Sequence, residues 1–120
     1  MSAAKPRPIP RLRIVLGADA ALGPGKADLL EGIVETGSIA AAGRRLKMSY
    51  RRAWSLVDEL NHLFAEPLVV AEKGGSRGGG AHLTETGEAV LATYRRMEEI
   101  ARAGMRKELD ALGKLAARRR

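Results

Sequence analysis

The sequence predicts a small, mainly α-helical domain with one short β-hairpin. Aromatic residues make up only 3% of the 120 residues, so the core has to be built from Leu, Val, Ile, Met and Ala, a composition that favours helices over a β-sandwich. Apolar residues recur at helical spacing over most of the chain, and strand-like patterns are confined to short stretches. The length is that of a single domain.

The first elements in chain order are an arm, a strand and a helix. Residues 1–10 contain three prolines and two basic residues, and we expect them to form a flexible, extended arm. The next segment, RLRIVLG (11–17), alternates in polarity as a short strand does. Gly23-Pro24-Gly25 marks a break between this strand and the next element. KADLLEGIVETG (26–37) then predicts a helix that ends at Gly37.

Two further helices follow with a short turn between them. The second is predicted from Ser38, as its N-cap, to Leu46, and residues 40–43 are all Ala or Gly. Ser49 can cap a third helix that runs to about Phe64. Helices joined by a turn of three or four residues can cross closely when the contact face carries small residues. This pair therefore predicts a helix-turn-helix.

The rest of the chain predicts a hairpin and a long helix. PLVVAEK, GGSRGGG and AHL (67–83) read as strand, turn and strand. Thr84 is positioned to cap a final helix over about 85–113, and residues 114–120 form a basic tail. The complete order is that of a winged helix-turn-helix with a long C-terminal dimerisation helix. We assign residues 11–113 to this domain.

The charge points to a polyanionic partner. The net charge is +7 and the isoelectric point is about 10.4, which makes nucleic acid the first candidate and an anionic membrane surface the second. Residues 44–52 hold five cations and no acidic residue. A run of this kind can also be an ordinary solvated helix face. Its position in a helix-turn-helix favours double-stranded DNA as the partner.

The start of the third helix is the predicted base-reading element. On a helical wheel Ala53, Val57, Leu60 and Phe64 face the core, while Arg51 points to the opposite side. The N-terminal residues of the second helix of such a motif meet base edges in the major groove, where arginine can bond guanine O6 and N7. The candidates for base contact are Ser49, Tyr50, Arg51, Arg52 and Ser55. Trp54 lies next to the core face, where a packing role is the commoner one.

Other cations are predicted to contact the DNA backbone. Residues at the end of the second helix and in the turn would lie over phosphates, and the glycine-rich hairpin tip would act as a wing (73–82) on the backbone or in the minor groove. The candidates for phosphate contact are Arg44, Arg45, Lys47, Lys73 and Arg77, with His82 as a further possibility. The alternative for the tip is a solvent loop without a binding role.

The sequence gives little support for an enzyme. There is no cysteine, and His62 and His82 have neither metal-ligand spacing nor a partner motif. Gly25-Lys26 is followed by Ala27, which excludes a phosphate-binding P-loop. We predict no catalytic residue, no metal and no cofactor. The sequence also lacks a secretory signal and an apolar stretch of membrane-spanning length, so we expect a cytoplasmic, nucleoid-associated protein.

The last helix carries an apolar seam. Apolar residues recur there at spacings of three and four, as in a coiled coil, and predict a homodimer. The dimerisation candidates are Val90, Tyr94, Met97, Ala101, Met105, Leu109 and Leu112, with Ala116 continuing the pattern.

These motifs resemble a known family. GSIAAAGRRLKMSYRRAWSLVDELN (37–61) and PLVV…GGSRGGGAHLTETGE (67–88) are similar to the N-terminal DNA-binding domain of ModE-type molybdate-responsive regulators, and more distantly to the LysR-type helix-turn-helix. The resemblance covers about residues 12 to 112. It implies a dimeric transcriptional regulator that inserts helix 49–64 into the major groove and binds an inverted repeat.

The resemblance stops short of molybdate sensing. ModE-type regulators carry C-terminal oxyanion-binding domains, whereas this sequence ends at KLAARRR. We therefore expect a stand-alone DNA-binding domain that does not bind a small-molecule effector by itself. Two alternatives stay open: an architectural protein that binds DNA without sequence preference, and, with less support, an oxyanion-binding protein that uses the glycine-rich loop.

Overall fold

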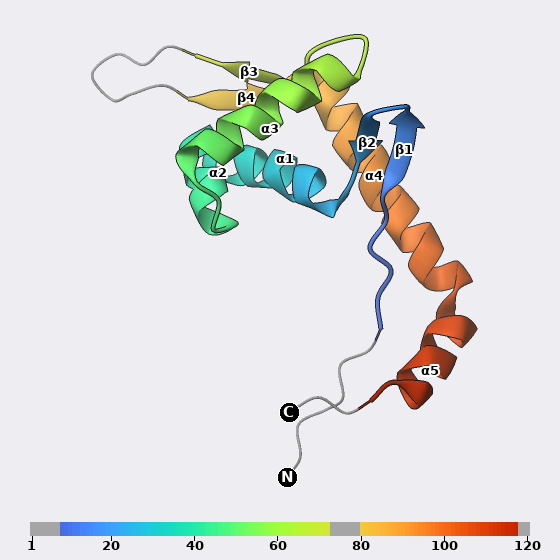
Figure 1. Cartoon of the computed structure of the whole chain (residues 1–120). Helices are drawn as coiled ribbons and strands as arrows, with labels where there is room; N and C mark the ends of the chain where they lie inside the picture. The colour runs from blue at the N-terminus through green and yellow to red at the C-terminus, as the bar shows by residue number, and fades with distance from the viewer. Residues whose placement is uncertain (1–7, 73–79, 118–120) are drawn as a thin grey trace.

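The computed structural model describes residues 8–72 and 80–117. It has two small hairpins and five helices in these ranges (Figure 1). In chain order the elements are β1 (Ile14–Gly17), β2 (Ala20–Leu22), α1 (Pro24–Thr36), α2 (Ile39–Arg45), α3 (Tyr50–Leu63), β3 (Val69–Ala71), β4 (Ala81–Leu83), α4 (Glu85–Gly104) and α5 (Arg106–Leu115). The arrangement is a winged helix-turn-helix, as predicted.

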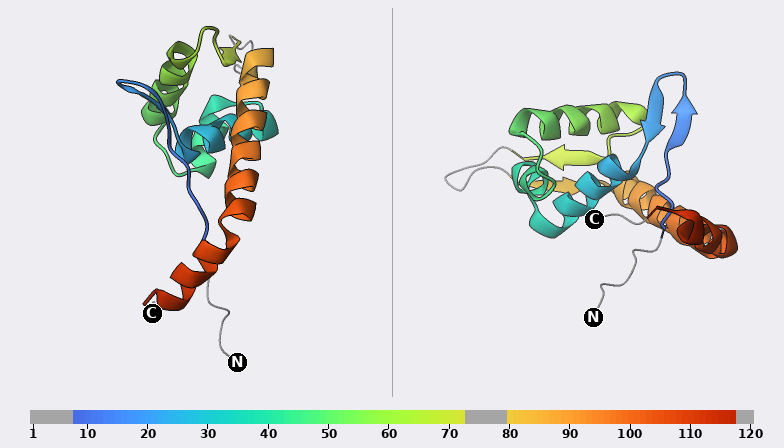
Figure 2. Two further views of the ribbon diagram at one scale, coloured as in Figure 1. Left: turned by 90° about the vertical axis from the view of Figure 1, so that its right-hand side faces the viewer. Right: turned by 60° about the horizontal axis from the view of Figure 1, so that its bottom comes forward.

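Helix α1 lies at the centre of the domain (Figures 1 and 2). It contacts α2, α3, α4 and strand β4, so it joins the helix-turn-helix, the wing and α4. The largest fully buried side chains come from α1, α3, α4 and the residue before β3, and they form one core, namely Leu29, Leu30, Ile33, Leu60, Leu68 and Tyr94.

Small residues allow the first three helices to cross closely. A Cβ atom added to Gly32 of α1 would lie 2.9 Å from the Ala42 Cβ atom of α2. One added to Gly43 of α2 would lie 2.8 Å from the Ala53 Cβ atom of α3. Both distances are too short for two carbon atoms, so each crossing requires glycine at one position. This confirms the prediction of a close contact from the run of small residues at 40–43.

The three predicted N-caps are confirmed. The hydroxyl oxygen of Ser38 accepts a hydrogen bond from the Ala41 N–H (3.1 Å), and that of Ser49 from the Arg52 N–H (3.0 Å). Thr84 accepts in the same way from the Gly87 N–H at 2.9 Å. Each bond satisfies a backbone donor that the helix itself cannot pair.

The wing strands pair as predicted, while only the first strand of the N-terminal hairpin was predicted. β3 and β4 are antiparallel, with Val69 opposite Leu83. The strand predicted over 11–17 begins at Ile14 and pairs with β2, which sequence analysis missed. Helix α1 also begins at Pro24, inside the predicted chain break, because proline suits the first helical position, where its missing N–H is not needed.

The continuous helix predicted over 85–113 is wrong. Helix α4 ends at Gly104, and α5 begins at Arg106 and leaves in a different direction (Figure 2). Met105 between them has φ −108° and ψ 17°, outside helical values. Glycine before it lowers the cost of leaving the helix. Helix α5 then reaches the N-terminal segment, where a Cβ atom on Gly113 would lie 3.1 Å from Pro8 Cδ.

Within the described ranges, no helix has the length and apolar character needed to cross a bilayer.

Two glycines of helix α4 should respond in opposite ways to a methyl group. A Cβ atom on Gly87 would lie 2.2 Å from the Leu68 carbonyl oxygen, whereas one on Gly104 would have no neighbour within 4 Å outside its own helix. Gly87→Ala should lower the free energy of unfolding by about 3 kcal/mol through overpacking. Gly104→Ala should raise it by about 0.5 kcal/mol. Urea unfolding followed by circular dichroism checks both, and equal midpoints for the two variants would contradict the packing described.

Candidate nucleic-acid interface

A compact turn holds α2 and α3 at a fixed angle. The Lys47 N–H bonds the Arg44 carbonyl (3.0 Å) and the Met48 N–H bonds the Gly43 carbonyl (2.9 Å). Lys47 has φ 59°, a left-handed conformation that is usual for glycine and costly for other residues. The turn of the helix-turn-helix therefore keeps Lys47 in a strained backbone conformation.

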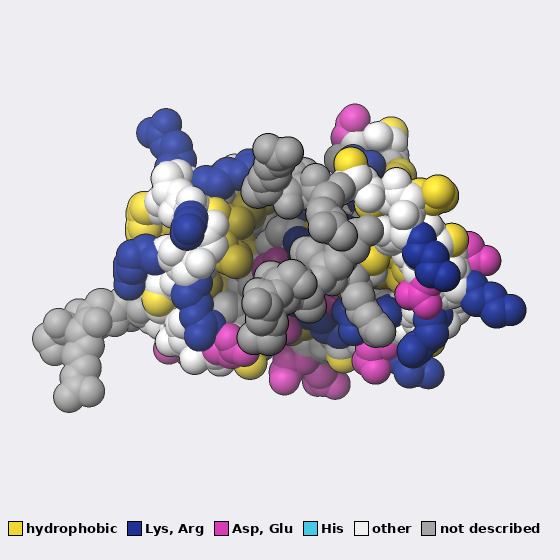
Figure 3. All heavy atoms as spheres, turned by 90° about the horizontal axis from the view of Figure 1, so that it is seen from below, with side chains coloured by type: hydrophobic (Ala, Val, Ile, Leu, Met, Phe, Trp, Pro, Cys, Tyr) yellow, Lys and Arg dark blue, Asp and Glu magenta, His cyan; other side chains and the backbone are white. Residues whose placement is uncertain are grey.

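The predicted base-contact residues lie at the exposed N-terminal end of α3. The predicted core face of this helix is confirmed for Ala53, Val57 and Leu60, which are buried. Phe64, its fourth predicted member, follows the last helical residue as the C-cap and is half-buried against the core. Arg51 and Arg52 form no ion pair among the described residues. The space-filling view shows Lys and Arg side chains gathered at the end of the molecule that carries α2 and the start of α3 (Figure 3). All five candidates are exposed, namely Ser49, Tyr50, Arg51, Arg52 and Ser55.

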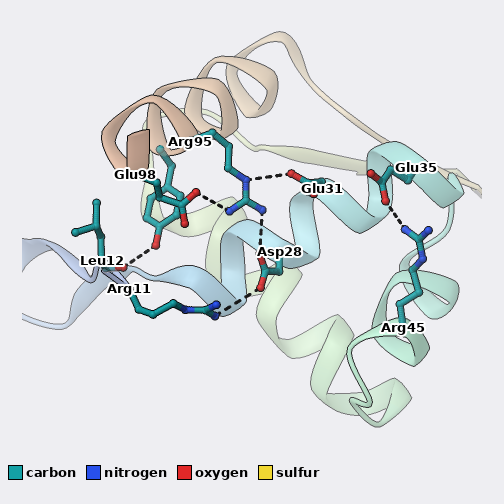
Figure 4. Close-up of polar contacts among 9 residues, drawn as sticks. Arg11, Leu12, Asp28, Glu31, Glu35, Arg45, Arg95 and Glu98 are labelled. Atoms are coloured by element: carbon teal, nitrogen blue, oxygen red, sulfur yellow. Dashed lines mark hydrogen bonds and ion pairs between the residues drawn. The ribbon is translucent and has the colours of Figure 1, made fainter. Parts of the chain in front are cut away.

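The predicted phosphate-contact residues divide into three groups. Arg44 and Lys47 are exposed and have no ion-pair partner within the described ranges. Arg45 instead pairs with Glu35 and so links α2 to α1 (Figure 4). Lys73 and Arg77 lie outside the described residues.

The wing histidine also has an acidic neighbour. His82 Nδ1 is 3.6 Å from the Glu72 carboxylate across the wing strands. The sequence gave no indication of this contact or of the Glu35–Arg45 pair, because each joins residues that are ten apart in the chain. We define the basic surface of α2 and α3 as Arg44, Lys47, Arg51 and Arg52.

An aromatic pair accompanies this basic surface. The Tyr50 and Trp54 rings lie one helical turn apart with centroids 6.0 Å from each other and planes tilted by 56°. Tyr50 is 66% exposed and Trp54 is 38% exposed. Trp54 is therefore partly buried, as a packing role requires, and keeps the rest of its ring accessible to solvent.

A cluster of charges fixes α4 against α1. Arg95 of α4 bonds Asp28 (2.9 Å) and Glu31 (3.0 Å) of α1, and also Glu98 (3.0 Å) on its own helix (Figure 4). Desolvation by burial lowers the pKa of Arg95, but the bonds to Asp28 and Glu98 outweigh it and raise that pKa above its ordinary value. Arg11 adds a contact to Asp28 at 3.8 Å. Arg95 is thus neutralised within the domain, unlike the cations of the basic surface.

The apolar seam of the C-terminal helices is only partly free. Tyr94 is 1% exposed, and its hydroxyl donates a hydrogen bond to the Leu12 carbonyl at 2.6 Å. Burial raises the pKa of this tyrosine. Tyr94 therefore packs within its own chain and leaves no side-chain surface for a partner.

Other seam residues remain available. Leu112 is 59% exposed and Met105 is also exposed, while Ile100, which the predicted seam omitted, is 55% exposed. The remaining predicted members are half-buried, namely Val90, Met97, Ala101 and Leu109. An apolar groove of about 250 Å³ lies between the N-terminal hairpin and α4, with Ile14, Leu16, Phe64 and Met97 in its lining.

The described residues contain no group of His, Asp and Glu side chains that could hold a metal ion.

Comparison with known proteins points to bacterial regulators. The family described as bacterial regulatory helix-turn-helix protein, lysR family, matches residues 26–88, from α1 into the start of α4. This is a family of regulators and not of enzymes. In a solved CbnR DBD–DNA complex, the similar chain is 28% identical with a TM-score of 0.56, over 72% of this chain and 95% of that one.

Two relatives carry molybdenum in their names. The chain is 43% identical over 95 residues to the molybdenum-pterin-binding protein MopB of Rhodobacter capsulatus, which covers 79% of this chain and 34% of the relative. It is 40% identical over 88 residues to the molybdenum transport protein ModE of Azotobacter vinelandii, over 73% and 33% respectively. The resemblance to ModE-type proteins is confirmed, and the chain spans about a third of the length of these curated relatives.

Two substitutions of Lys47 should separate the effect of its backbone conformation on stability from the effect of its charge. Lys47→Gly should raise the free energy of unfolding by about 0.5–1 kcal/mol, because glycine adopts positive φ at little cost. Lys47→Ala removes the same charge but keeps the strained backbone, and should give no such gain. Thermal unfolding of the three proteins checks this, and equal stability of the two variants would show that φ at position 47 carries no strain.

Proposed function

The chain belongs to the lysR family of bacterial regulatory helix-turn-helix proteins, and from this premise we propose that it is a sequence-specific DNA-binding regulator of transcription. The start of α3 enters the major groove and the wing lies along the backbone. The observation that carries the proposal is the set of exposed cations at the start of α3 that have no ion-pair partner in the described part of the chain, on a helix whose opposite face is fixed in the core.

The geometry supports different roles for different cations. Arg51 lies at the outermost position of α3, where a guanidinium can bond guanine O6 and N7. Arg44 and Lys47 lie before that helix and are suited to phosphates, which fix the position of the protein without reading sequence. Arg45 is the weaker candidate, because a phosphate would have to compete with Glu35.

A homodimer on an inverted repeat completes the proposal. Met105, Leu112 and Ile100 expose apolar surface along α4 and α5, and a second copy of the chain can bury it. A two-fold dimer would present two α3 helices to half-sites about one DNA turn apart, roughly 34 Å. Tyr94, which packs in its own chain, is not part of this proposed interface.

Single substitutions should separate reading of bases from contact with phosphates. The probe is a duplex selected by the wild-type protein from a random library, compared with a shuffled duplex by fluorescence anisotropy. Arg51→Ala should weaken binding to the selected duplex by about 1–3 kcal/mol and reduce the preference over the shuffled one. Arg44→Ala should weaken both equally and reduce the salt slope by about one.

Arg96→Ala is the matched control for charge. It removes one exposed cation from α4, away from the helix-turn-helix, and should leave the preference intact. If Arg51→Ala behaved like Arg96→Ala, the assignment of Arg51 to base reading would be wrong. Equal affinity of the wild-type protein for both duplexes would favour the architectural alternative.

The proposed dimer can be tested with substitutions in α5. Leu112→Glu should weaken self-association by roughly ten-fold or more, because a buried leucine contributes about 1.5–3 kcal/mol. Ala111→Glu introduces the same charge about 100° away on the helix and should have a smaller effect. Sedimentation equilibrium measures both. A wild-type protein that is monomeric at high micromolar concentration would exclude the proposed dimer.

A further inference from the structure

Trp54 and Tyr50 expose apolar surface that the fold does not use. No hydrogen bond is made by the Trp54 indole N–H or the Tyr50 hydroxyl within residues 8–72 and 80–117. Neither residue belongs to the buried core cluster, and Trp54 keeps 38% of its surface exposed. Such exposure of two neighbouring aromatic rings has a cost in water that binding of a partner would remove.

The pair lies on the flank of α3 that faces the wing. At 100° per residue, Tyr50, Trp54 and Asn61 project within about 40° of one another. The Asn61 side chain bonds the wing strand, since its Oδ1 accepts from the Leu68 and Val69 N–H groups (both 2.9 Å) and its Nδ2 donates to the Val69 carbonyl (3.1 Å). The aromatic pair therefore lies along α3 between its outermost residues and the wing.

The surrounding charge indicates what covers the pair. Arg51 follows Tyr50 directly, Ser49 precedes it, and Arg44 and Lys47 lie in the preceding helix and turn, all exposed. No acidic residue occurs between positions 44 and 57. An apolar protein partner would have to desolvate these cations, whereas DNA neutralises them with its phosphates. Charge complementarity thus favours DNA as the occupant.

We propose that Tyr50 and Trp54 form an apolar reader that packs against the C5-methyl groups of thymine in each half-site. In the major groove this methyl group is the apolar feature by which thymine differs from the other bases, and apolar side chains recognise it by contact. Arg51 would read a neighbouring base pair on the outer side of the helix. The proposal rests on the proposed function and adds Trp54 as a residue that determines specificity.

Trp54 reports on this contact directly, because it is the only tryptophan of the chain. Its quenching by acrylamide is measured while anisotropy of a dye-labelled, selected duplex reports binding in the same sample. Loss of acrylamide quenching as the anisotropy rises is the expected result. Rising anisotropy with unchanged quenching would overturn the proposed contact of Tyr50 and Trp54 with DNA and leave DNA binding in place. Constant anisotropy would overturn both this contact and the proposed function.

The thymine methyl group can be tested without changing the protein. Replacing one contacted dT by dU removes only that methyl group, and should weaken binding about four-fold, the equivalent of one buried methylene. The same change in flanking DNA is the control and should have no effect. With Trp54→Ala, whose folding is checked by circular dichroism, the loss caused by dU should disappear if the two groups are in contact.

Three outcomes would overturn the proposal while DNA binding stands. The first is a selected site that contains no thymine. The second is an affinity that does not change with dU at any position of the site. The third is protection of Trp54 that depends on protein concentration in the absence of DNA, since a second copy of the chain would then cover the pair.

Discussion

The close crossing of α1, α2 and α3 is the constraint on which the rest of the structure depends. Gly32 against Ala42 and Gly43 against Ala53 bring the helix backbones together at distances that larger side chains would not allow. Because α1 also contacts β4 and α4, this crossing fixes the direction in which α3 presents its first turn relative to the wing. The orientation of the candidate interface is therefore set by the packing of small residues between the helices.

The cations of the chain fall into two environments. Arg95 is surrounded by three carboxylates and holds α4 to α1, and Arg45 is paired with Glu35. Arg44 and Arg51 have no such partner among the described residues and are exposed to solvent, where water and salt screen their repulsion. The domain thus keeps like charges together on one surface where they cost little, and an anion can still reach them.

The parts of the fold that depend on local chemistry could be predicted from the sequence. Ser38, Ser49 and Thr84 act as caps through backbone groups three residues away, and the core face of α3 follows from its period. The features that sequence reasoning missed depend on distant residues. Strand β2 forms only because it pairs with β1, and Tyr94 is buried by its contact with Leu12, 82 positions earlier. The bend at Met105, where α5 turns towards Pro8, has no strong breaker beyond Gly104. The 38% exposure of Trp54 depends on what packs beside α3 in the folded domain, which helical period alone does not determine.

The central claim is that this basic, precisely held helix start recognises sequence and not only charge. The most direct measurement is the affinity of the wild-type protein for the DNA upstream of its own gene and for a shuffled version, titrated at several salt concentrations. A regulator should bind the native fragment tighter by about 10³ or more, with a preference that persists as salt rises. Equal affinities that fall steeply with salt would leave only the release of counterions and would contradict the account.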